Sequence, residues 1–342
     1  MNNVNRQWLL ATRPSGMVSE LHFEYHEAAV PEPKLAEGEY LVRNLYLSFE
    51  PAMRGWMNDE PSYLPPSELG EPMRSTAVGQ IVRSENPEFP EGQFVQGMFG
   101  WQDFAIGGGS SEMFPGNVIP DGVPPTMPLT IMGGTALTAY FGLLHVGQPK
   151  EGETVLVSGA AGATGSVVAQ IAKLKGCRVI GIAGGPAKCR WLLEDLGLDH
   201  VIDYKNEDVS ERLGALCANG INVFFDNVGG QTLAAGIDHI AQFGRIVLCG
   251  AISEYNNDRP APGPNNLMNL VKFSVRMEGF IMFNYIDQID QAFADLGQWL
   301  ADGKLQWKED IQQGFDQIPA TFLRLFSGAN DGKQLLKIAD PD

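Results

Sequence analysis

At 342 residues, the chain is long enough for two domains and can bury a large core. Its 41 acidic and 24 basic residues give a formal net charge of −17, which argues against unaided binding to nucleic acid or to an anionic membrane. No apolar stretch reaches transmembrane length, and the first residues lack a signal-peptide pattern, so we expect a cytoplasmic protein.

The first 128 residues predict a β-rich domain. They are rich in proline and glycine, and short apolar runs such as residues 39–49 and 79–84 lie between turn signals. The tail, residues 306–342, contains the apolar run 333–339, which we expect to return to this first domain as a strand.

From residue 152 onward, apolar strands and helices alternate regularly. Strands that lack polar alternation and are separated by helices are typical of a parallel sheet buried on both faces. We therefore predict an α/β fold in which residues 129–305 form a doubly wound, dinucleotide-binding domain. The expected strands are 154–160, 177–184, 200–204, 221–229, 245–251 and 279–285, and the expected helices are 166–176, 187–197, 210–220, 231–244 and 289–303.

Three glycines, Gly159, Gly162 and Gly165, follow the first strand of this sheet and open its first helix. Backbone N–H groups and the positive helix end bind pyrophosphate at this place in the fold. The spacing is GxxGxxG rather than GxGxxG, so the loop alone could also be a tight turn without a ligand. The βαβ series around it favours cofactor binding.

The end of the second strand indicates which dinucleotide is bound. NAD-binding proteins carry an acidic residue there, about 20 positions after the glycine loop. This chain has Gly184 and Gly185 instead, with Lys188 just beyond and no carboxylate before Glu194. Loss of the acid and gain of a cation favour the 2′-phosphate of NADP, although Lys188 could also be a solvated helix residue.

No metal site is predicted. A zinc site needs clustered Cys and His ligands. His22 and His26 have no third ligand beside them, and the cysteines are scattered without a CxxC pair, as is usual for reduced core thiols. The four cysteines are Cys177, Cys189, Cys217 and Cys249.

Five ordered segments together resemble one family over essentially the whole chain. They are GAAGATGSVVAQIAKLKGCRVIGIAGGPAK, FDNVGG, CGAISEYN, GFIMFNY and GANDGKQLLKI. The chain is similar to the zinc-independent medium-chain dehydrogenases/reductases of the prostaglandin reductase, leukotriene B4 dehydrogenase and alkenal double-bond reductase group, which includes bacterial curcumin reductase. The resemblance implies a GroES-like fold for the first domain, a homodimer, and NADPH-dependent reduction of the carbon–carbon double bond of small α,β-unsaturated ketones and aldehydes.

The resemblance also implies a set of cofactor-binding residues. The phosphate loop is Gly162, Ala163, Thr164 and Gly165, with Lys188 at the 2′-phosphate and Tyr204 beside it. The rest of the cofactor is lined by Asn227, Cys249, Gly250, Ala251, Ile252, Ser253, Tyr255, Phe280, Ile281, Met282 and Asn330. Taken without the resemblance, Asn227 and Asn330 read as turn residues and Phe280 as core.

Tyr255 is the one catalytic residue that the resemblance implies. Hydride transfer to the β-carbon of an enone leaves negative charge on the carbonyl oxygen, and a hydrogen-bond donor placed there lowers the barrier. A phenol is neutral at pH 7 and can donate such a bond, a role that the cofactor ribose could share. The alternative for Tyr255 is a surface-loop anchor.

The resemblance further implies that Ala52, Met53, Arg54 and Tyr63 line the substrate pocket. Several plant relatives have tyrosine in place of Ala52, so more room is expected there. Two other functions remain open: an NADPH quinone reductase of the same superfamily, and a non-catalytic NADPH-binding protein. A zinc alcohol dehydrogenase is rejected because its ligands are absent.

Overall fold

The computed structural model describes residues 4–31, 35–108 and 116–341 and divides the chain into two compact units. The first, here the β-rich unit, comprises Met1–Leu129, Glu309–Asn330 and Gln334–Asp342. The second, here the α/β unit, comprises Thr130–Lys308 and Asp331–Lys333. No described helix has the length and apolar character needed to cross a membrane.

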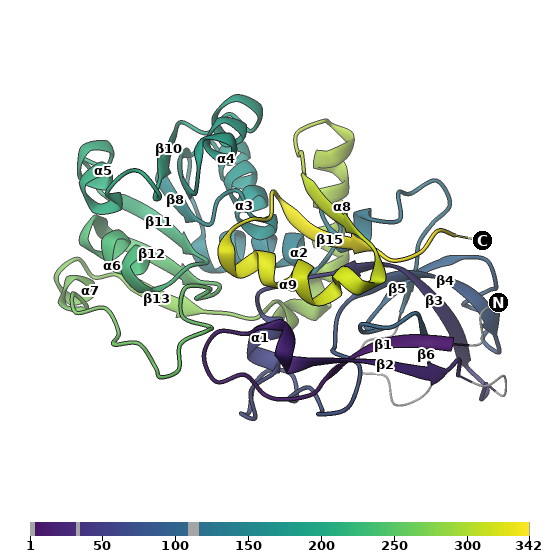
Figure 1. Ribbon diagram of the computed structural model, residues 1–342. Coiled ribbons are helices and arrows are strands. Elements are labelled where there is room, and N and C mark those ends of the chain that lie inside the picture. The colour runs from purple at the N-terminus through teal and green to yellow at the C-terminus, as the bar shows by residue number, and fades with distance from the viewer. Residues whose placement is uncertain (1–3, 32–34, 109–115, 342) are drawn as a thin grey trace. The chain divides into compact units, whose positions relative to one another are not determined.

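The β-rich unit is built from antiparallel strands (Figure 1). One sheet has the strand order β14-β15-β3-β4-β5-β7 with β6 also paired to β3, and β1 and β2 form a separate pair. The strands are β1 (Val4–Leu10), β2 (Phe23–Ala29), β3 (Glu39–Ser48), β4 (Ala77–Ser84), β5 (Phe94–Gly97), β6 (Phe104–Gly108), β7 (Asn117–Val118), β14 (Glu309–Gln313) and β15 (Lys333–Lys337). The helical segments are η1 (Glu20–His22), α1 (Met53–Trp56), η2 (Met127–Leu129), η6 (Phe315–Gln317) and α9 (Ile318–Ser327).

The C-terminal run returns to this unit as a strand, which confirms the expectation from sequence. In β15, Leu335 lies opposite Ser48 of β3 in an antiparallel ladder. Aromatic rings fill the core nearby: fully buried Trp101 has its ring centroid 4.8 Å from that of Phe23 and 5.7 Å from that of Phe322 in α9. These tilted and edge-to-face contacts join the N-terminal and C-terminal segments of the chain within one core.

The α/β unit contains the predicted parallel sheet. Its strand order is β10-β9-β8-β11-β12-β13, and all its ladders are parallel. This is the doubly wound order, with the first strand in the middle and the direction of winding reversed between β8 and β11. The strands are β8 (Thr154–Ser158), β9 (Arg178–Ala183), β10 (His200–Asp203), β11 (Ile221–Asp226), β12 (Ile240–Leu248) and β13 (Arg276–Gly279). The helical segments are α2 (Gly134–Phe141), η3 (Gly142–Gly147), α3 (Ala163–Leu174), α4 (Pro186–Arg190), η4 (Trp191–Asp195), α5 (Val209–Leu216), α6 (Gly230–Asp238), α7 (Met268–Lys272), η5 (Met282–Gln288) and α8 (Ile289–Ala301).

Two elements differ most from the sequence prediction. The helix expected over 231–244 ends at Asp238, because Ile240 already begins β12 and pairs with Ile221 of β11. The strand expected over 279–285 is wrong after Gly279, where η5 soon follows as a 3-10 helix. Gly279 pairs with Leu248, the last residue of β12, so the ladder has no partner strand beyond that point.

Helix α6 packs on β11 through a glycine. A Cβ at Gly236 would overlap the ring of Phe224, which is fully buried and so has no room to move away. By contrast, Gly297 in α8 has open space around the position of its missing Cβ.

We predict opposite effects of alanine at these two glycines. Gly297→Ala should raise the unfolding free energy by up to about 1 kcal/mol, since alanine favours a helix more than glycine does. Gly236→Ala gains the same helix propensity but overpacks the core, and should lower stability by about 1–3 kcal/mol. Chemical denaturation of both variants tests this, and a stabilised Gly236→Ala variant would contradict the packing argument.

Candidate functional site

The predicted cofactor residues of the α/β unit all follow carboxyl ends of its strands, at one edge of the sheet (Figure 1). In doubly wound sheets, ligands bind at this edge, beside the point where the winding reverses. Here that point lies between Ser158 at the end of β8 and Asp226 at the end of β11.

The glycine loop makes a close turn from β8 into α3. Gly159 has a φ of 59°, a left-handed conformation that glycine adopts without strain, and its carbonyl accepts a hydrogen bond from Gly162 N at 2.9 Å. A Cβ at Gly165 would overlap that same carbonyl oxygen. Gly162 is the N-cap of α3, so Ala163, Thr164 and Gly165 form its first turn, whose N–H groups have no partner within a helix. The loop can therefore hold an anion against the helix end.

A buried hydrogen-bond network joins β8 to β11 beside this loop. Ser158 Oγ donates to Asp226 Oδ1 at 2.6 Å and accepts from the Asn227 backbone N–H at 2.8 Å. The Asn227 side chain donates from Nδ2 to the Ser158 carbonyl at 2.7 Å. The network fixes Asn227 at the switch point, directly against the glycine loop.

Asp226 is the centre of the network and is fully buried. Besides Ser158, its carboxylate accepts the backbone N–H groups of Val228 at 3.1 Å and Gly229 at 2.9 Å. Burial raises the pKa of Asp226, and these hydrogen bonds oppose the shift by stabilising the charged form. A buried carboxylate with three donors holds the turn into α6 in one conformation.

The segment 249–255 folds back onto residues 226–228. The N–H groups of Cys249 and Gly250 donate to the Asp226 carbonyl at 2.9 and 3.3 Å, and Ser253 donates to the Val228 carbonyl from both N and Oγ. Ile252 N donates to the Asn227 carbonyl at 3.3 Å. Two motifs that are separate in the sequence thus form one wall of the site.

Tyr255 is partly buried, and its hydroxyl is turned toward its own loop. The oxygen accepts the Ala251 N–H at 3.1 Å, and a Cβ at Gly250 would lie 2.7 Å from it. A phenol that accepts one hydrogen bond still carries its own proton. Burial raises the pKa of the neighbouring Cys249 thiol to about 12, and Asp226 adds to this, so the thiol is neutral at pH 7.

The residues after β9 and β10 form the region where the 2′-phosphate of the cofactor is expected. Gly185, with a φ of 94°, is the N-cap of α4, the helix that carries the partly buried Lys188. The Tyr204 ring packs over Gly184, where a Cβ would lie 2.7 Å from it. Asp203 Oδ1 accepts the Gly185 N–H at 2.8 Å, and this bond lowers the pKa of Asp203.

After β13, the chain turns into the unit. The Phe280 ring lies edge-on to Phe225 with centroids 6.3 Å apart and covers Gly142, so this side chain contributes to packing. Ile281 precedes η5 and Met282 begins it, and the Met282 sulfur lies near Gly134 at the start of α2.

The predicted substrate residues lie in the β-rich unit, on and around α1. Met53 and Arg54 are buried, and the Arg54 guanidinium donates to the carbonyls of Pro14 and Gly16 at 3.1 and 3.0 Å. Burial lowers the pKa of Arg54. Ala52 is partly accessible, and Tyr63 is exposed, with its hydroxyl accepting the Trp56 indole N–H at 3.0 Å. Asn330 is also in this unit, between α9 and β15.

Four polar residues that organise the site were missed from the sequence: Ser158, Asp203, Asp226 and Glu254. The first three are the last residues of β8, β10 and β11, so a polar residue that closes an apolar strand is the signal that could have found them. Glu254 accepts the Gly230 N–H at 3.0 Å, a contact between distant segments that no local pattern indicates.

Two family models match the chain. Residues 6–114 match the N-terminal domain of oxidoreductase, and residues 163–301 match a model described as zinc-binding dehydrogenase. Within the described residues, no group of three or more His, Cys, Asp or Glu side chains is placed to hold a metal ion.

Full-length relatives are similar to this chain. The NADPH-dependent curcumin reductase of Escherichia coli is 40% identical, over 99% of this chain and 98% of that protein. Bovine prostaglandin reductase 1 is 38% identical, over 97% and 98%. The crystal structure of CurA in complex with NADPH from Vibrio vulnificus is 41% identical with a TM-score of 0.91, covering 98% of this chain and all of that one. The chain therefore belongs to the zinc-independent medium-chain dehydrogenase/reductase family, in the group of the curcumin and prostaglandin reductases.

Proposed function

We propose that this chain reduces the carbon–carbon double bond of α,β-unsaturated ketones and aldehydes with NADPH. The observation that carries the proposal is that the glycine loop, Asn227 and the 249–255 segment converge at the switch point of the sheet. The fold of the chain also matches that of a relative solved with NADPH. The named activity of the 40% identical curcumin reductase supports the substrate class.

The site fits NADP rather than NAD. The glycine loop offers backbone N–H groups for the pyrophosphate, and Gly184 and Gly185 leave no acid at the end of β9 to hold a ribose diol. Asp203 does come near, but its carboxylate is occupied by Gly185 N, Lys205 N and the Asn206 side chain. Lys188 supplies a cation for the 2′-phosphate, and Tyr204 flanks it.

Bound NADPH supplies the hydride, and the protein's part is to orient the substrate and stabilise charge. Tyr255 is proposed to donate a hydrogen bond to the carbonyl oxygen as negative charge develops there. A first domain, residues 1–128 completed by 306–342, is proposed to carry the substrate residues, and residues 129–305 are proposed as the dinucleotide-binding domain, with Asn330 contributed to the cofactor from the first domain. Ala52 and Tyr63 are the accessible members of the substrate set, whereas Met53 and Arg54 support the loop from within.

A substrate panel tests the function. NADPH oxidation should be seen with enones and enals, more slowly with quinones, and not with saturated ketones. Preference for quinones would favour a quinone reductase, and NADPH binding without any turnover would favour a non-catalytic protein. The cytoplasmic location also remains a prediction, for cell fractionation to test.

Lys188→Ala should weaken NADPH roughly 10- to 100-fold, because the 2′-phosphate loses a charge-assisted hydrogen bond. NADH lacks that phosphate, so its affinity should change little. Fluorescence titration of both cofactors measures this, with Lys304→Ala, an exposed lysine bonded to Asp302, as the control. Equal losses for NADPH and NADH would contradict the assignment.

Tyr255→Phe should lower enone turnover, and by less than the roughly 100- to 1,000-fold seen when a sole oxyanion donor is lost, since the ribose hydroxyl can share the role. NADPH affinity should stay near the parent value, and quinone turnover should fall less.

The structure supplies a comparison for this variant, because Tyr255→Phe also removes the acceptor of the Ala251 N–H. Ser253→Ala removes the 2.6 Å bond from Oγ to the Val228 carbonyl and loosens the same loop while the phenol stays. Its losses should fall on enone and quinone alike. If Tyr255→Phe shows that same pattern, or no loss, Tyr255 is a loop anchor.

The chain is proposed to act as a homodimer, the commonest symmetry of soluble oligomers. Strand β13 is an edge of the described sheet, and an unpaired strand edge is a template for pairing with a second chain (Figure 1). Met268 and Val271 on the adjacent helix α7 are 72% and 71% exposed, which adds apolar surface beside that edge.

Sedimentation velocity should therefore give a dimer for the parent chain. Met268→Glu with Val271→Glu should shift the protein to monomer, because two carboxylates would be placed in an apolar interface. Leu21→Glu, at an 89% exposed leucine of the β-rich unit, is the control that should remain dimeric. A monomeric parent, or a double variant that stays dimeric, would argue against this surface.

A further inference from the structure

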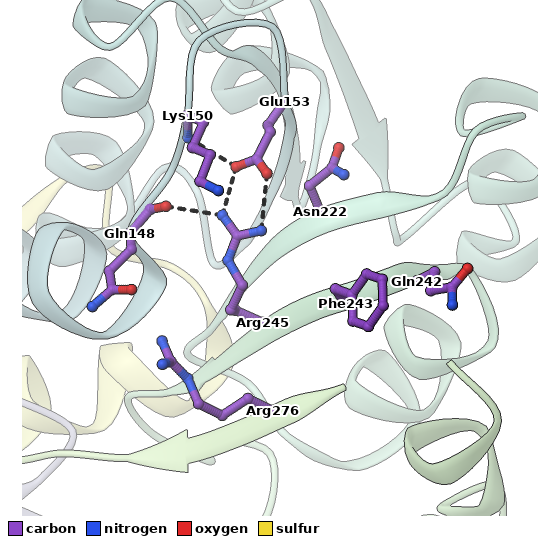
Figure 2. Close-up of a pocket in the computed structure, with 8 residues that line it drawn as sticks. All are labelled: Gln148, Lys150, Glu153, Asn222, Gln242, Phe243, Arg245 and Arg276. Atoms are coloured by element: carbon purple, nitrogen blue, oxygen red, sulfur yellow. Dashed lines mark hydrogen bonds and ion pairs between the residues drawn. The ribbon is translucent and has the colours of Figure 1, made fainter. Parts of the chain in front are cut away.

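One cavity in the α/β unit lies far along the strands from the proposed cofactor site. It has a volume of about 360 Å³ and is lined by residues at or before the amino ends of the strands and by the turn before Arg245 in β12 (Figure 2). Cavities of roughly 300–1,000 Å³ are the size of small-molecule sites. The lining residues are Gln148, Lys150, Glu153, Asn222, Gln242, Phe243, Arg245 and Arg276.

The charge of this lining is opposite to that of the whole chain. It contains three cations, Lys150, Arg245 and Arg276, and one carboxylate, Glu153, in a chain with a net charge of −17. Arg245 neutralises Glu153 through two hydrogen bonds of 2.9 and 2.5 Å, and both side chains are mostly buried. This pair lowers the pKa of Glu153 and is the fixed floor of the cavity. Lys150 and Arg276 are the two other cations of the lining, and Arg276 also lies 3.4 Å from Glu278, which is outside the lining.

Two side chains at this cavity have hydrogen-bond donors without a partner among the described residues. The Lys150 ammonium forms no hydrogen bond or ion pair with a described residue, although its backbone N–H binds Glu153 (Figure 2). Asn222 accepts the Thr154 N–H through Oδ1, which leaves its Nδ2 donors without a described partner. Arg276 donates to the Val146 carbonyl and lies 3.4 Å from Glu278, but its side chain is still 47% exposed. These donors can bind an oxyanion.

Two residues that line the cavity, Phe243 and Gln148, have an unusual backbone conformation. Phe243 has a φ of 60°, which is rare for an aromatic residue, and is 67% exposed. Gln148, another lining residue, has a φ of 47°. Strained backbone of this kind clusters at binding sites, where the surrounding structure maintains it. Here it presents an exposed ring beside the cations.

We propose that this cavity binds a small organic oxyanion, a carboxylate or phosphate monoester with an aromatic or apolar group. Lys150 and Arg276 hold the acid group, Asn222 adds a donor, and the Phe243 ring packs on the apolar group. Because the cavity is at the edge of the sheet opposite the glycine loop, its ligand is distinct from the cofactor and does not compete with it.

Calorimetric titration with benzoate and phenyl phosphate tests the proposal. The protein is first saturated with NADP⁺, which removes the glycine loop and Lys188 from competition, and ionic strength is held constant. One molecule of at least one of these anions should bind per chain, and comparison of the two identifies the acid group. Benzyl alcohol, the neutral probe, should bind much more weakly.

Three variants locate the site. Lys150→Gln should weaken the anion about ten-fold or more, and it leaves the fold intact because the ammonium has no described partner to lose. Phe243→Gly removes the ring while accepting the positive φ, and should weaken phenyl phosphate several-fold but not inorganic phosphate. Lys304→Gln changes an exposed lysine that does not line the cavity, and should bind as the parent does. Absence of saturable binding, equal binding of benzyl alcohol, or unchanged affinity in Lys150→Gln overturns the proposal.

Discussion

The hydrogen bond from Ser158 to Asp226 is the constraint on which the site depends. It spans the reversal point of the sheet and joins residues 68 positions apart. A carboxylate buried this fully is costly unless its oxygens are satisfied. Satisfying Asp226 requires Ser158, Val228 and Gly229 together, so the end of β8 and the turn after β11 can adopt only one arrangement.

That arrangement decides where small residues must lie. With Asn227 bonded to the Ser158 carbonyl, the glycine loop and the 249–255 segment approach each other closely. Position 165 must be glycine because a Cβ there would overlap the Gly159 carbonyl oxygen. Position 250 must be glycine because a Cβ there would overlap the Tyr255 hydroxyl. These glycines serve the packing of protein on protein as well as the approach of a ligand. The two interpretations of the glycine loop, a tight turn and a cofactor-binding loop, are therefore compatible.

Patterns along the chain predicted the parallel sheet, because strands buried on both faces are apolar throughout. The same reasoning predicted the glycine loop and Lys188 at strand ends, a position set by topology, whereas the other cofactor residues were implied by the family resemblance. It failed at residues 240–244, where Ile237, Ile240 and Ala241 have helical spacing, yet Ile240 pairs with Ile221 in a ladder. It could not find Asp226 as an organiser, because both the burial and the donors of that carboxylate come from pairing with β8. Local periodicity is visible in sequence, whereas a partner 68 positions away is not.

The two proposed anion sites, at the carboxyl and amino edges of the sheet, use different groups to bind negative charge. At the carboxyl edge, the proposed site holds its anion through the main chain, with the backbone N–H groups of the glycine loop at a helix end. At the amino edge, the Arg245 guanidinium is already bonded to Glu153 and to the carbonyls of Gly147 and Gln148. Positive charge there comes from flexible side chains, Lys150 and Arg276, on a rigid floor. A main-chain site demands one ligand shape, whereas a side-chain site can accept a class of anions. At the proposed site of the amino edge, selectivity would therefore come from the apolar surface, where the exposed ring of Phe243 lines the same cavity as the cations.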